Sequence, residues 1–412
     1  MVVAGDTIYL RGGRHYYSAK ISISKVGTSI ARYNLIAYPG ERPILDFSAM
    51  AYDSSNRGVS LSGQYWYIKG LDIYKAGDNG MNISGSNNII EFCAFYENCD
   101  TGLQLGGGAA NNQIINCDSY YNYDYLSDKP GENADGFSPK LDVGTGNYFY
   151  GCRSWQNSDD AYDGYLSSDS NITTTYENCW AFKNGYLKDG SPILTGNGNG
   201  FKMGGNSYRH NVILKNCLSF NNRVKGFDQN NNKGSMTLYN CTAFTNGTNY
   251  NITSAIASGK TVTVANCVSA GTGAVNLVSF VVKITDSWMN PPFVVTNADF
   301  AGIDPSAAYG PRKADGSLPD ISFMRLAGTS DLIDGGTNVG LPFYGDAPDL
   351  GAFEYIDGDC QPDGRVDWAD LKCLVDNWLD EECGTCNGAD FSGDDNKVNF
   401  RDFAIMADNW LK

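Results

Sequence analysis

Six hexapeptides decide the fold of this chain: CAFYEN at 93–98, CDSYYN at 117–122, CRSWQN at 152–157, CWAFKN at 179–184, CLSFNN at 217–222 and CTAFTN at 241–246. Each begins with cysteine, contains an aromatic residue and ends with asparagine. A seventh copy, CVSAGT at 267–272, keeps the cysteine, and an eighth, TDSWMN, places Thr285 at the cysteine position and Asn290 at the end. The shortest spacing between cysteines is 24 residues, and longer intervals interrupt it. This pattern indicates one repeated structural unit with inserted loops.

A second motif alternates with the first. A glycine precedes a short apolar or mixed segment at Gly80, Gly102, Gly136, Gly164, Gly200 and Gly226. Short strands, tight turns and a period in the twenties predict an all-β solenoid of parallel strands, the right-handed parallel β-helix. We place this domain at residues 1–356 and expect an irregular C-terminal cap at about 291–356.

The repeated asparagine and cysteine side chains have a structural explanation. Stacked asparagines can hydrogen-bond from coil to coil at the strand spacing of about 4.8 Å. A cysteine that recurs in a stacked core behaves as a small apolar residue. We therefore predict buried ladders of both residue types. In the C-terminal tail, by contrast, one or two disulfides are expected among Cys360, Cys373, Cys383 and Cys386.

Composition restricts the classes of function. The chain has 412 residues, a net charge of −16 and only two histidines, His15 and His210. The acidic balance disfavours a nucleic-acid partner, and the scarcity of histidine disfavours Ser–His–Asp catalysis and histidine-rich zinc sites. Because no apolar run is long enough for a membrane span, we predict none. We expect a secreted monomer whose signal peptide and N-terminal capping helix precede Met1.

Polar residues between positions 135 and 202 form the candidate site. They belong to the segments NADGFSPK, NSDDAYDGY and GNGNGFKMGG and are Asp135, Asp159, Asp160, Asp163 and Lys202. Asp135 and Asp163 each precede a turn glycine, so we expect them one above the other on consecutive coils. Asp159 and Asp160 should reach the same corner. Four carboxylates there cannot all stay ionised without a cation, and oxygen ligands in an irregular cage favour Ca²⁺.

Lys202 follows its turn glycine by two residues. On this alignment it lies one coil from Asp163 and about 10 Å along the same face, a gap that suits a sugar ring between cation and amine. The ordinary alternatives are aspartates that cap turns and a lysine in solvent, and the convergence of the group favours a site. Further basic residues that could line a groove are Lys140, Lys183, Arg223 and Lys225.

These three segments resemble polysaccharide lyase family 9, the pectate lyases built on a right-handed β-helix, and the resemblance extends over most of residues 5–356. It implies Lys202 as the Brønsted base and implies four primary calcium ligands, Asp135, Asp159, Asp160 and Asp163. The implied substrate is polygalacturonate. Neutral Lys202 would take the carbon-5 proton while calcium stabilises the carbon-6 carboxylate, which leaves a 4,5-unsaturated sugar. Calcium is expected to lower the pKa of Lys202.

Three other functions remain consistent with the residues. A lyase could act on another uronate polysaccharide. A glycoside hydrolase would use Asp135 and Asp163 as the acid and base that flank the bond, and a chelator separates it from a calcium-dependent lyase. A non-catalytic β-helix that binds calcium and glycan would give no unsaturated product.

The tail at residues 357–412 is a tandem duplication in which Val366 and Trp378 match Val398 and Trp410. Each half combines an acidic loop with a helix of apolar periodicity. The first loop places aspartates at positions 1, 5, 9 and 12 of a calcium loop, namely Asp359, Asp363, Asp367 and Asp370. The second loop is one residue longer and offers Asp390, Asp394, Asn399 and Asp402. The duplication resembles a type I dockerin, which implies calcium in the loops and a cohesin-type scaffold as partner.

Overall fold

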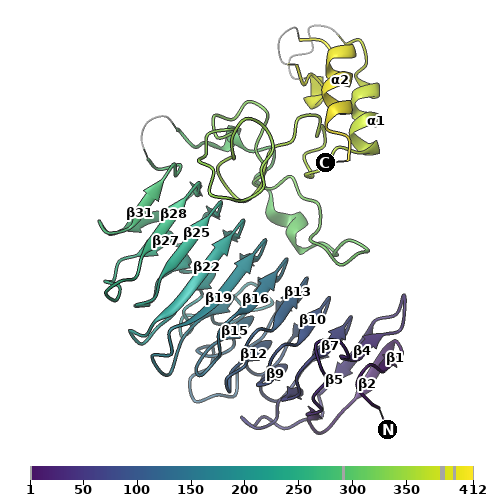
Figure 1. Cartoon of the computed structure of the whole chain (residues 1–412), viewed down its shortest axis with the longest axis vertical. Coiled ribbons are helices and arrows are strands. Elements are labelled where there is room, and N and C mark those ends of the chain that lie inside the picture. Colours follow the sequence, from purple (N-terminus) through teal and green to yellow (C-terminus); the bar gives the residue numbers. More distant parts are fainter. Residues whose placement is uncertain (1, 290–292, 381–385, 393–395, 412) are drawn as a thin grey trace. The chain divides into compact units, whose positions relative to one another are not determined.

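The computed structural model describes residues 2–289, 293–380, 386–392 and 396–411. Its strands form three parallel sheets in which each strand pairs with the strand three positions later in the chain (Figure 1). Each coil therefore gives one strand to each sheet, and the predicted right-handed parallel β-helix is confirmed. The chain divides into two compact units, one with Met1–Leu238, Ala243–Thr263 and Thr272–Val282, the other with Tyr239–Thr242, Val264–Gly271 and Lys283–Lys412.

The sheets are named A, B and C in the order in which the chain enters them. Sheet A contains β1 (Thr7–Leu10), β4 (Tyr33–Ala37), β7 (Trp66–Lys69), β10 (Ile89–Glu91), β13 (Gln113–Ile115), β16 (Asn147–Tyr150), β19 (Ile172–Glu177), β22 (His210–Lys215), β25 (Met236–Tyr239), β28 (Val262–Ala265) and β31 (Val282–Ile284). Sheet B contains β2 (Gly13–Tyr16), β5 (Pro43–Asp46), β8 (Asp72–Tyr74), β11 (Ala94–Tyr96), β14 (Asp118–Tyr120), β17 (Arg153–Trp155), β20 (Trp180–Phe182), β23 (Leu218–Phe220), β26 (Thr242–Phe244) and β29 (Val268–Ala270). Sheet C contains β3 (Ile21–Ile23), β6 (Val59–Leu61), β9 (Met81–Ile83), β12 (Leu103–Leu105), β15 (Phe137–Pro139), β18 (Tyr162–Asp163), β21 (Phe201–Lys202), β24 (Lys225–Asp228), β27 (Thr248–Ile252) and β30 (Ala274–Leu277).

Both predicted ladders are present. The seven repeat cysteines are buried, and each thiol donates to the carbonyl two residues earlier, as Cys93 does to Glu91 O at 3.4 Å. The asparagine amides link successive coils, for example Asn98 Nδ2 to Asn122 Oδ1 at 2.9 Å. The chain of amide contacts continues through Asn157, Asn184, Asn222 and Asn246. These buried contacts satisfy the polar groups of the turns from one coil to the next.

The last copy of the repeat differs from the prediction by one residue. Asp286, not Thr285, takes the cysteine position, because Cys267 N donates to Asp286 Oδ1 at 3.0 Å as Cys93 N does to Cys117 Sγ at 3.5 Å. The position predicted from the repeat is wrong because the Ser–Trp pair of TDSWMN was matched to the Ser–Trp pair of CRSWQN. Asn290 lies outside the described residues. Burial raises the pKa of Asp286 to about 8.

A column of stacked rings sets the register of sheet C. The ring centroids of Phe137, Tyr162, Phe201, Phe227 and Tyr250 follow one another at 5.4, 4.6, 5.2 and 5.0 Å. Because side chains alternate along a strand, the residue after each buried ring belongs to one outward row. Within this row Asp163 pairs with Lys202, and Lys202 pairs with Asp228.

Buried His210 on β22 is held neutral by its surroundings. Its Nε2 lies 2.8 Å from Thr174 Oγ1 and its Nδ1 lies 2.7 Å from Gly164 O. Burial lowers the pKa of His210 to about 4. The stability that neutral His210 contributes is therefore complete above the pKa of histidine in the unfolded chain. It is lost as the pH falls towards the pKa of His210 in the folded chain.

This loss should be measurable against His210→Gln, which has no ionisable group. Between about pH 7 and pH 4, the difference in unfolding free energy between wild type and variant should shrink by about 3 kcal/mol. Chemical denaturation at each pH gives this difference, and the other titrating groups cancel in it. A difference that stays constant over this range would show that His210 is not buried as a neutral group.

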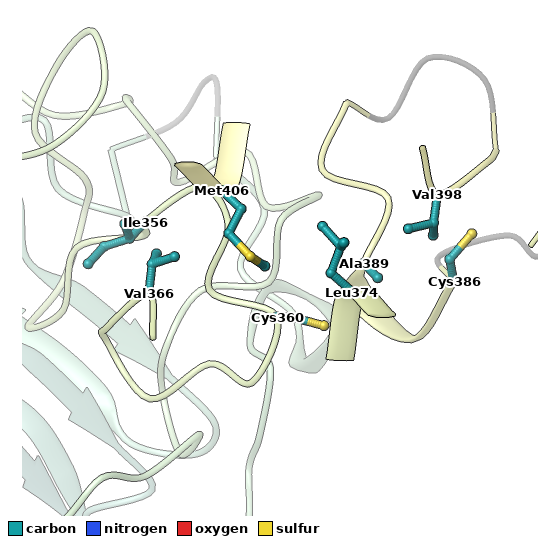
Figure 2. Close-up of a cluster of buried hydrophobic side chains, with 8 residues drawn as sticks. All are labelled: Ile356, Cys360, Val366, Leu374, Cys386, Ala389, Val398 and Met406. Atoms are coloured by element: carbon teal, nitrogen blue, oxygen red, sulfur yellow. The ribbon is translucent and has the colours of Figure 1, made fainter. Parts of the chain in front are cut away.

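The C-terminal part is irregular and then helical. Residues 293–356 contain two short 3₁₀ helices, η1 (Asn297–Asp299) and η2 (Pro305–Tyr309). The tail contains α1 (Trp368–Asp376), η3 (Cys386–Gly388) and α2 (Phe400–Asp408). Figure 2 shows its buried core, which includes Ile356, Val366, Leu374 and Met406. None of the described helices has the length and apolarity that a membrane span requires.

Candidate active site

Three of the five candidate residues, Asp159, Asp163 and Lys202, line a cavity of about 480 Å³. Its wall also contains Lys140. Further acidic residues in the wall are Asp78, Asp100, Asp124 and Glu132. A polyanionic sugar chain could enter such an acidic cavity only together with cations or beside the two lysines.

Three carboxylates converge behind the cavity wall, and one of them, Asp163, is part of that wall. Asp135, Asp160 and Asp163 each offer an oxygen within 4.8 Å of the others, and all three are buried. Asp135 and Asp160 precede strands β15 and β18, and Asp163 ends β18. Asp160 N donates to Asp135 Oδ1 at 3.1 Å, and Asn199 N donates to Asp160 Oδ1 at 2.8 Å. Asp135 and Asp160 thus each accept a hydrogen bond from a backbone amide of the next coil.

The prediction that Asp135 and Asp163 lie one above the other is wrong. Asp160, not Asp163, lies one coil from Asp135 at the equivalent position, because Phe137 pairs with Tyr162. The equivalent of the turn glycine Gly136 is Ala161, and Gly164 lies beyond the strand. Glycine alone was therefore a misleading marker of register, whereas the buried aromatic residue marks it correctly.

The position of Lys202 is corrected for the same reason. Lys202 is the strand partner of Asp163, so the expected offset of about 10 Å along the face is wrong. Its Nζ lies 3.0 Å from Asp160 Oδ2 and 3.3 Å from Asp163 Oδ1. The amine therefore touches the carboxylate group directly.

Asp159 lies beside the three converging carboxylates. Its Oδ1 accepts a hydrogen bond from Asn197 Nδ2 at 3.2 Å and another from Asn197 N. Burial raises the pKa of Asp159 well above its usual range, and the neighbouring Asp160 raises it further. The structure thus brings three of the four predicted carboxylates together, and the fourth, Asp159, lines the same cavity as Asp163.

Lys140 joins this group, although its sequence position suggested only a groove-lining role. Its Nζ lies 2.6 Å from Asp135 Oδ2 and 3.6 Å from Asp163 Oδ2. Ser138 on β15 also donates through Oγ to Asp135 Oδ2 at 2.7 Å. Because Lys140 follows Ser138 by two residues, the sequence indicated a shared face but not the contact of Lys140 with Asp135. Of the other basic candidates, Lys225 pairs with Asp228 at 3.0 Å, and Arg223 donates to Gly196 O. Lys183 has φ 54° at the turn after β20.

Burial and charge oppose each other in this group. Burial raises the pKa of Asp160 to about 7 although Lys202 opposes the shift. The pKa of Asp163 lies below its ordinary value, because Lys202 and Lys140 together outweigh burial. Burial alone would lower the pKa of Lys202, but Asp160 and Asp163 hold it well above its ordinary value.

The donor set fits a hard divalent cation. Carboxylate oxygens at this spacing are the ligands that Ca²⁺ prefers. Asp160 Oδ2 is buried and receives no hydrogen bond of normal geometry, although Lys202 Nζ lies near it. The charge of this oxygen is paired with Lys202 Nζ at 3.0 Å, so a cation bound here would share Asp160 with the lysine.

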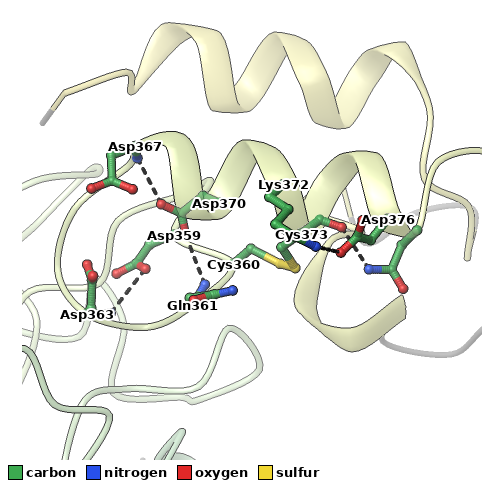
Figure 3. The surroundings of a disulfide bond; sticks show 10 residues. Asp359, Cys360, Gln361, Asp363, Asp367, Asp370, Lys372, Cys373 and Asp376 are labelled. Atoms are coloured by element: carbon green, nitrogen blue, oxygen red, sulfur yellow. Dashed lines mark hydrogen bonds and ion pairs between the residues drawn. A yellow bond between two sulfur atoms is a disulfide. The ribbon is translucent and has the colours of Figure 1, made fainter.

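In each tail loop the last aspartate accepts two backbone hydrogen bonds. In the first loop, Asp370 accepts from Gln361 N at 2.9 Å and from Asp367 N at 2.8 Å (Figure 3). Asp402 accepts from Ser392 N and Asn399 N, both at 2.9 Å. Asp359 accepts from Asp363 N at 3.2 Å, and Asp390 accepts from Ser392 Oγ at 3.1 Å.

The structure describes three of the four tail cysteines for which disulfides are predicted. Cys360 is bonded to Cys373, in agreement with the expectation of at least one disulfide. Cys386 is also disulfide-bonded. Cys383 and the predicted ligand Asp394 lie outside the described residues.

Known proteins are similar to this chain over most of its length. A family model described as "Pel9A-like, right handed beta helix region" matches residues 1–275. Pectate lyase L of Dickeya dadantii (strain 3937) is 39% identical over 359 residues, which cover 85% of this chain and 83% of the relative. A crystal structure of pectate lyase Pel9A shares 39% identity with a TM-score of 0.80, over 86% of this chain and 88% of that one. A rhamnogalacturonan lyase shares 28% identity with a TM-score of 0.71, over 79% of this chain and 90% of that one.

Proposed function

The chain belongs to the Pel9A-like right-handed β-helix family, and from this membership we propose that it is a calcium-dependent pectate lyase. The observation that supports this function most is the contact of Lys202 with Asp160 and Asp163. A basic residue and carboxylates suited to a cation thereby lie in direct contact, as β-elimination from a uronate requires.

Lys202 acts as the base in this proposal. In its neutral form it takes the proton from carbon 5 of the galacturonate ring. The electron pair forms the double bond between carbons 4 and 5, and the glycosidic oxygen at carbon 4 leaves and takes up a proton from water. The products are a saturated end and a 4,5-unsaturated end.

Asp135, Asp159, Asp160 and Asp163 would hold calcium. When bound, the cation supplies positive charge that stabilises the carbon-6 carboxylate as the carbon-5 proton leaves. The same cation would offset the attraction of the carboxylates for the Lys202 proton. The burial of Asp135, whose side chain is fully inaccessible, argues against the alternative hydrolase role for this residue, because a general acid must reach the glycosidic oxygen.

Initial rates on several polysaccharides test the substrate. We expect polygalacturonate to react fastest when compared with alginate, rhamnogalacturonan and highly methyl-esterified pectin in the same calcium buffer. Faster reaction of rhamnogalacturonan would assign the chain to the activity named for its second structural relative. Equal inactivity on all four would favour a non-catalytic glycan-binding protein.

Lys140 should oppose calcium binding. Its ammonium group occupies oxygens of Asp135 and Asp163 that the cation needs, and like charges repel at this separation. Lys140→Met should therefore bind calcium at least about 10-fold more tightly in titration calorimetry without substrate. Lys225→Met is the matched control, since Lys225 pairs with Asp228 instead. Weaker calcium binding by Lys140→Met would make Lys140 a support of the site.

We propose that residues 357–412 form a dockerin-like module that binds a cohesin-type scaffold through two calcium loops. The loops comprise Asp359, Asp363, Asp367 and Asp370, then Asp390, Asp394, Asn399 and Asp402. The disulfide between Cys360 and Cys373 supports action outside the cell.

Removal of the tail tests whether the β-helix carries the catalysis and the tail carries the scaffold binding. Because Ile356 packs in the tail core, the truncated chain should end at Tyr355. It should keep nearly the full rate on soluble polygalacturonate and lose binding to a cohesin column. A truncated chain that does not fold would show that the tail supports the preceding segment.

A further inference from the structure

A second cavity, of about 430 Å³, lies across one turn and one loop from the cavity that contains Lys202. Glu97 and Asn98 line it, whereas the next two residues, Cys99 and Asp100, line the first cavity. The loop at 123–127 is divided in the same way, with Tyr123 and Tyr125 in the second cavity and Asp124 and Ser127 in the first. We call the second one the tyrosine cavity, because Tyr121, Tyr123 and Tyr125 all line it.

The tyrosine cavity has a fixed aromatic floor. The Tyr121 ring meets Tyr120 edge-on at 5.0 Å and Trp155 at 6.5 Å. Both belong to a column of stacked rings on sheet B, in which successive centroids are 4.3–5.5 Å apart. This column contains Tyr74, Tyr96, Tyr120, Trp155, Phe182 and Phe220. A ring held on such a column keeps its orientation, which lowers the entropy cost of stacking a ligand on it.

A loop between β20 and β21 closes one side. Gln156 Nε2 donates to Leu187 O at 2.7 Å, and Lys188 Nζ pairs with Glu97 at 2.6 Å and lies 5.2 Å from the Tyr121 ring centre. Lys75 lies 3.6 Å from the same Glu97 carboxylate. The loop is thus tied to three successive coils. Asp189 also lines the wall, but its carboxylate accepts from Ser191 N within the loop.

The chemistry of this cavity suits a sugar. Aromatic rings stack on the C–H face of a pyranose, while amide, carboxylate and ammonium groups bind its hydroxyls. Lys75 and Lys188 additionally suit the carboxylate of a uronic acid, and the volume lies within the range of small-ligand sites, about 300–1,000 Å³. The exposed fraction of Tyr125 is 52%, so its ring is accessible.

We propose that the tyrosine cavity binds galacturonate residues of the same chain that is cleaved beside Lys202, as a remote subsite. This inference rests on the proposed function. A polymer that passes over the turn at 97–100 would contact both cavities at once, and the second contact would raise affinity without touching the reacting bond.

The test compares two matched tyrosine pairs in the full-length chain, with Lys202→Ala present to prevent turnover. Tyr123 and Tyr125 have ring centres 5.9 Å apart, and the control pair Tyr9 and Tyr38 has centres 6.1 Å apart. Calorimetry with galacturonate trimer and octamer gives the affinity gained by chain length. Tyr123→Ala/Tyr125→Ala should reduce this octamer-to-trimer ratio about 10-fold, and Tyr9→Ala/Tyr38→Ala should leave it unchanged.

A chelator separates this inference from the proposed function. In EDTA the octamer should still bind weakly to the control variant and should lose that binding in Tyr123→Ala/Tyr125→Ala. A ratio equal to that of the control pair would overturn the remote subsite while leaving the lyase intact. Tighter binding of neutral galactan oligomers than of galacturonate octamer would also overturn it. Absence of unsaturated product from the wild type would refute the lyase alone.

Discussion

Replacement of Lys202 by arginine should lower the lyase rate by about 10²–10⁴-fold, the usual contribution of a general base. Arginine keeps the positive charge but cannot be deprotonated, so this variant separates a base from an electrostatic clamp. Lys202→Ala should lose a similar factor. Because Lys202 contacts Asp160 and Asp163, its removal also changes the charge at the cation site, and rates must be compared at saturating calcium.

Initial rates on polygalacturonate, together with titration of calcium and a galacturonate oligomer, give the complete comparison. We expect both variants to bind the oligomer while turnover falls. If Lys202→Arg kept most of the wild-type rate, Lys202 would bind the substrate carboxylate and another group would be the base.

The second large effect should follow from Asp160→Asn. Asparagine keeps an oxygen that can accept from Asn199 N, so the turn should remain folded. The substitution removes one negative charge from the three carboxylates. Calcium affinity should therefore fall by about 10²-fold or more, since loss of a residue that only supports a metal ligand already lowers affinity by up to about 10²-fold. Activity at low calcium should fall in parallel and recover partly at high calcium.

Asp228→Asn is the matched control for Asp160→Asn, because Asp228 is also a buried aspartate, lies on β24 and pairs with Lys225. Both variants should melt close to wild type without calcium. Only Asp160→Asn should lose the part of the calcium-dependent rise in melting temperature that the site in the β-helix contributes. Equal calcium affinity in the two variants would remove Asp160 from the site.

The solenoid could be predicted because its turns repeat a chemically simple solution. Each coil needs a partner for its turn amides, and asparagine supplies it, so Asn98 and its equivalents recur at one position. The strand register of sheet C was harder to predict from the sequence. Glycine recurs wherever backbones approach closely, as at Gly136, where a Cβ would lie 1.9 Å from Ser154 Oγ, but Ala161 takes that place in the next coil.

The candidate site was predicted in residue identity more completely than in geometry. Aligning the buried rings Phe137, Tyr162 and Phe201 places Asp160 over Asp135 and Lys202 beside Asp163. The contact of Lys140 with Asp135 depends on how a side chain leaves the end of β15, which spacing alone does not specify. The tyrosine cavity depends on a loop that belongs to no repeat, so the periodicity of the sequence does not predict this cavity.

Ultraviolet absorbance of the reaction mixture tests the central claim most directly. The full-length chain is incubated with polygalacturonate in calcium, in EDTA, and in EDTA followed by excess calcium. The account predicts that absorbance from the 4,5-unsaturated product rises in the first mixture, stays flat in the second, and resumes in the third. Cleavage of the polymer without this absorbance, or equal absorbance in EDTA, would contradict a calcium-dependent β-elimination.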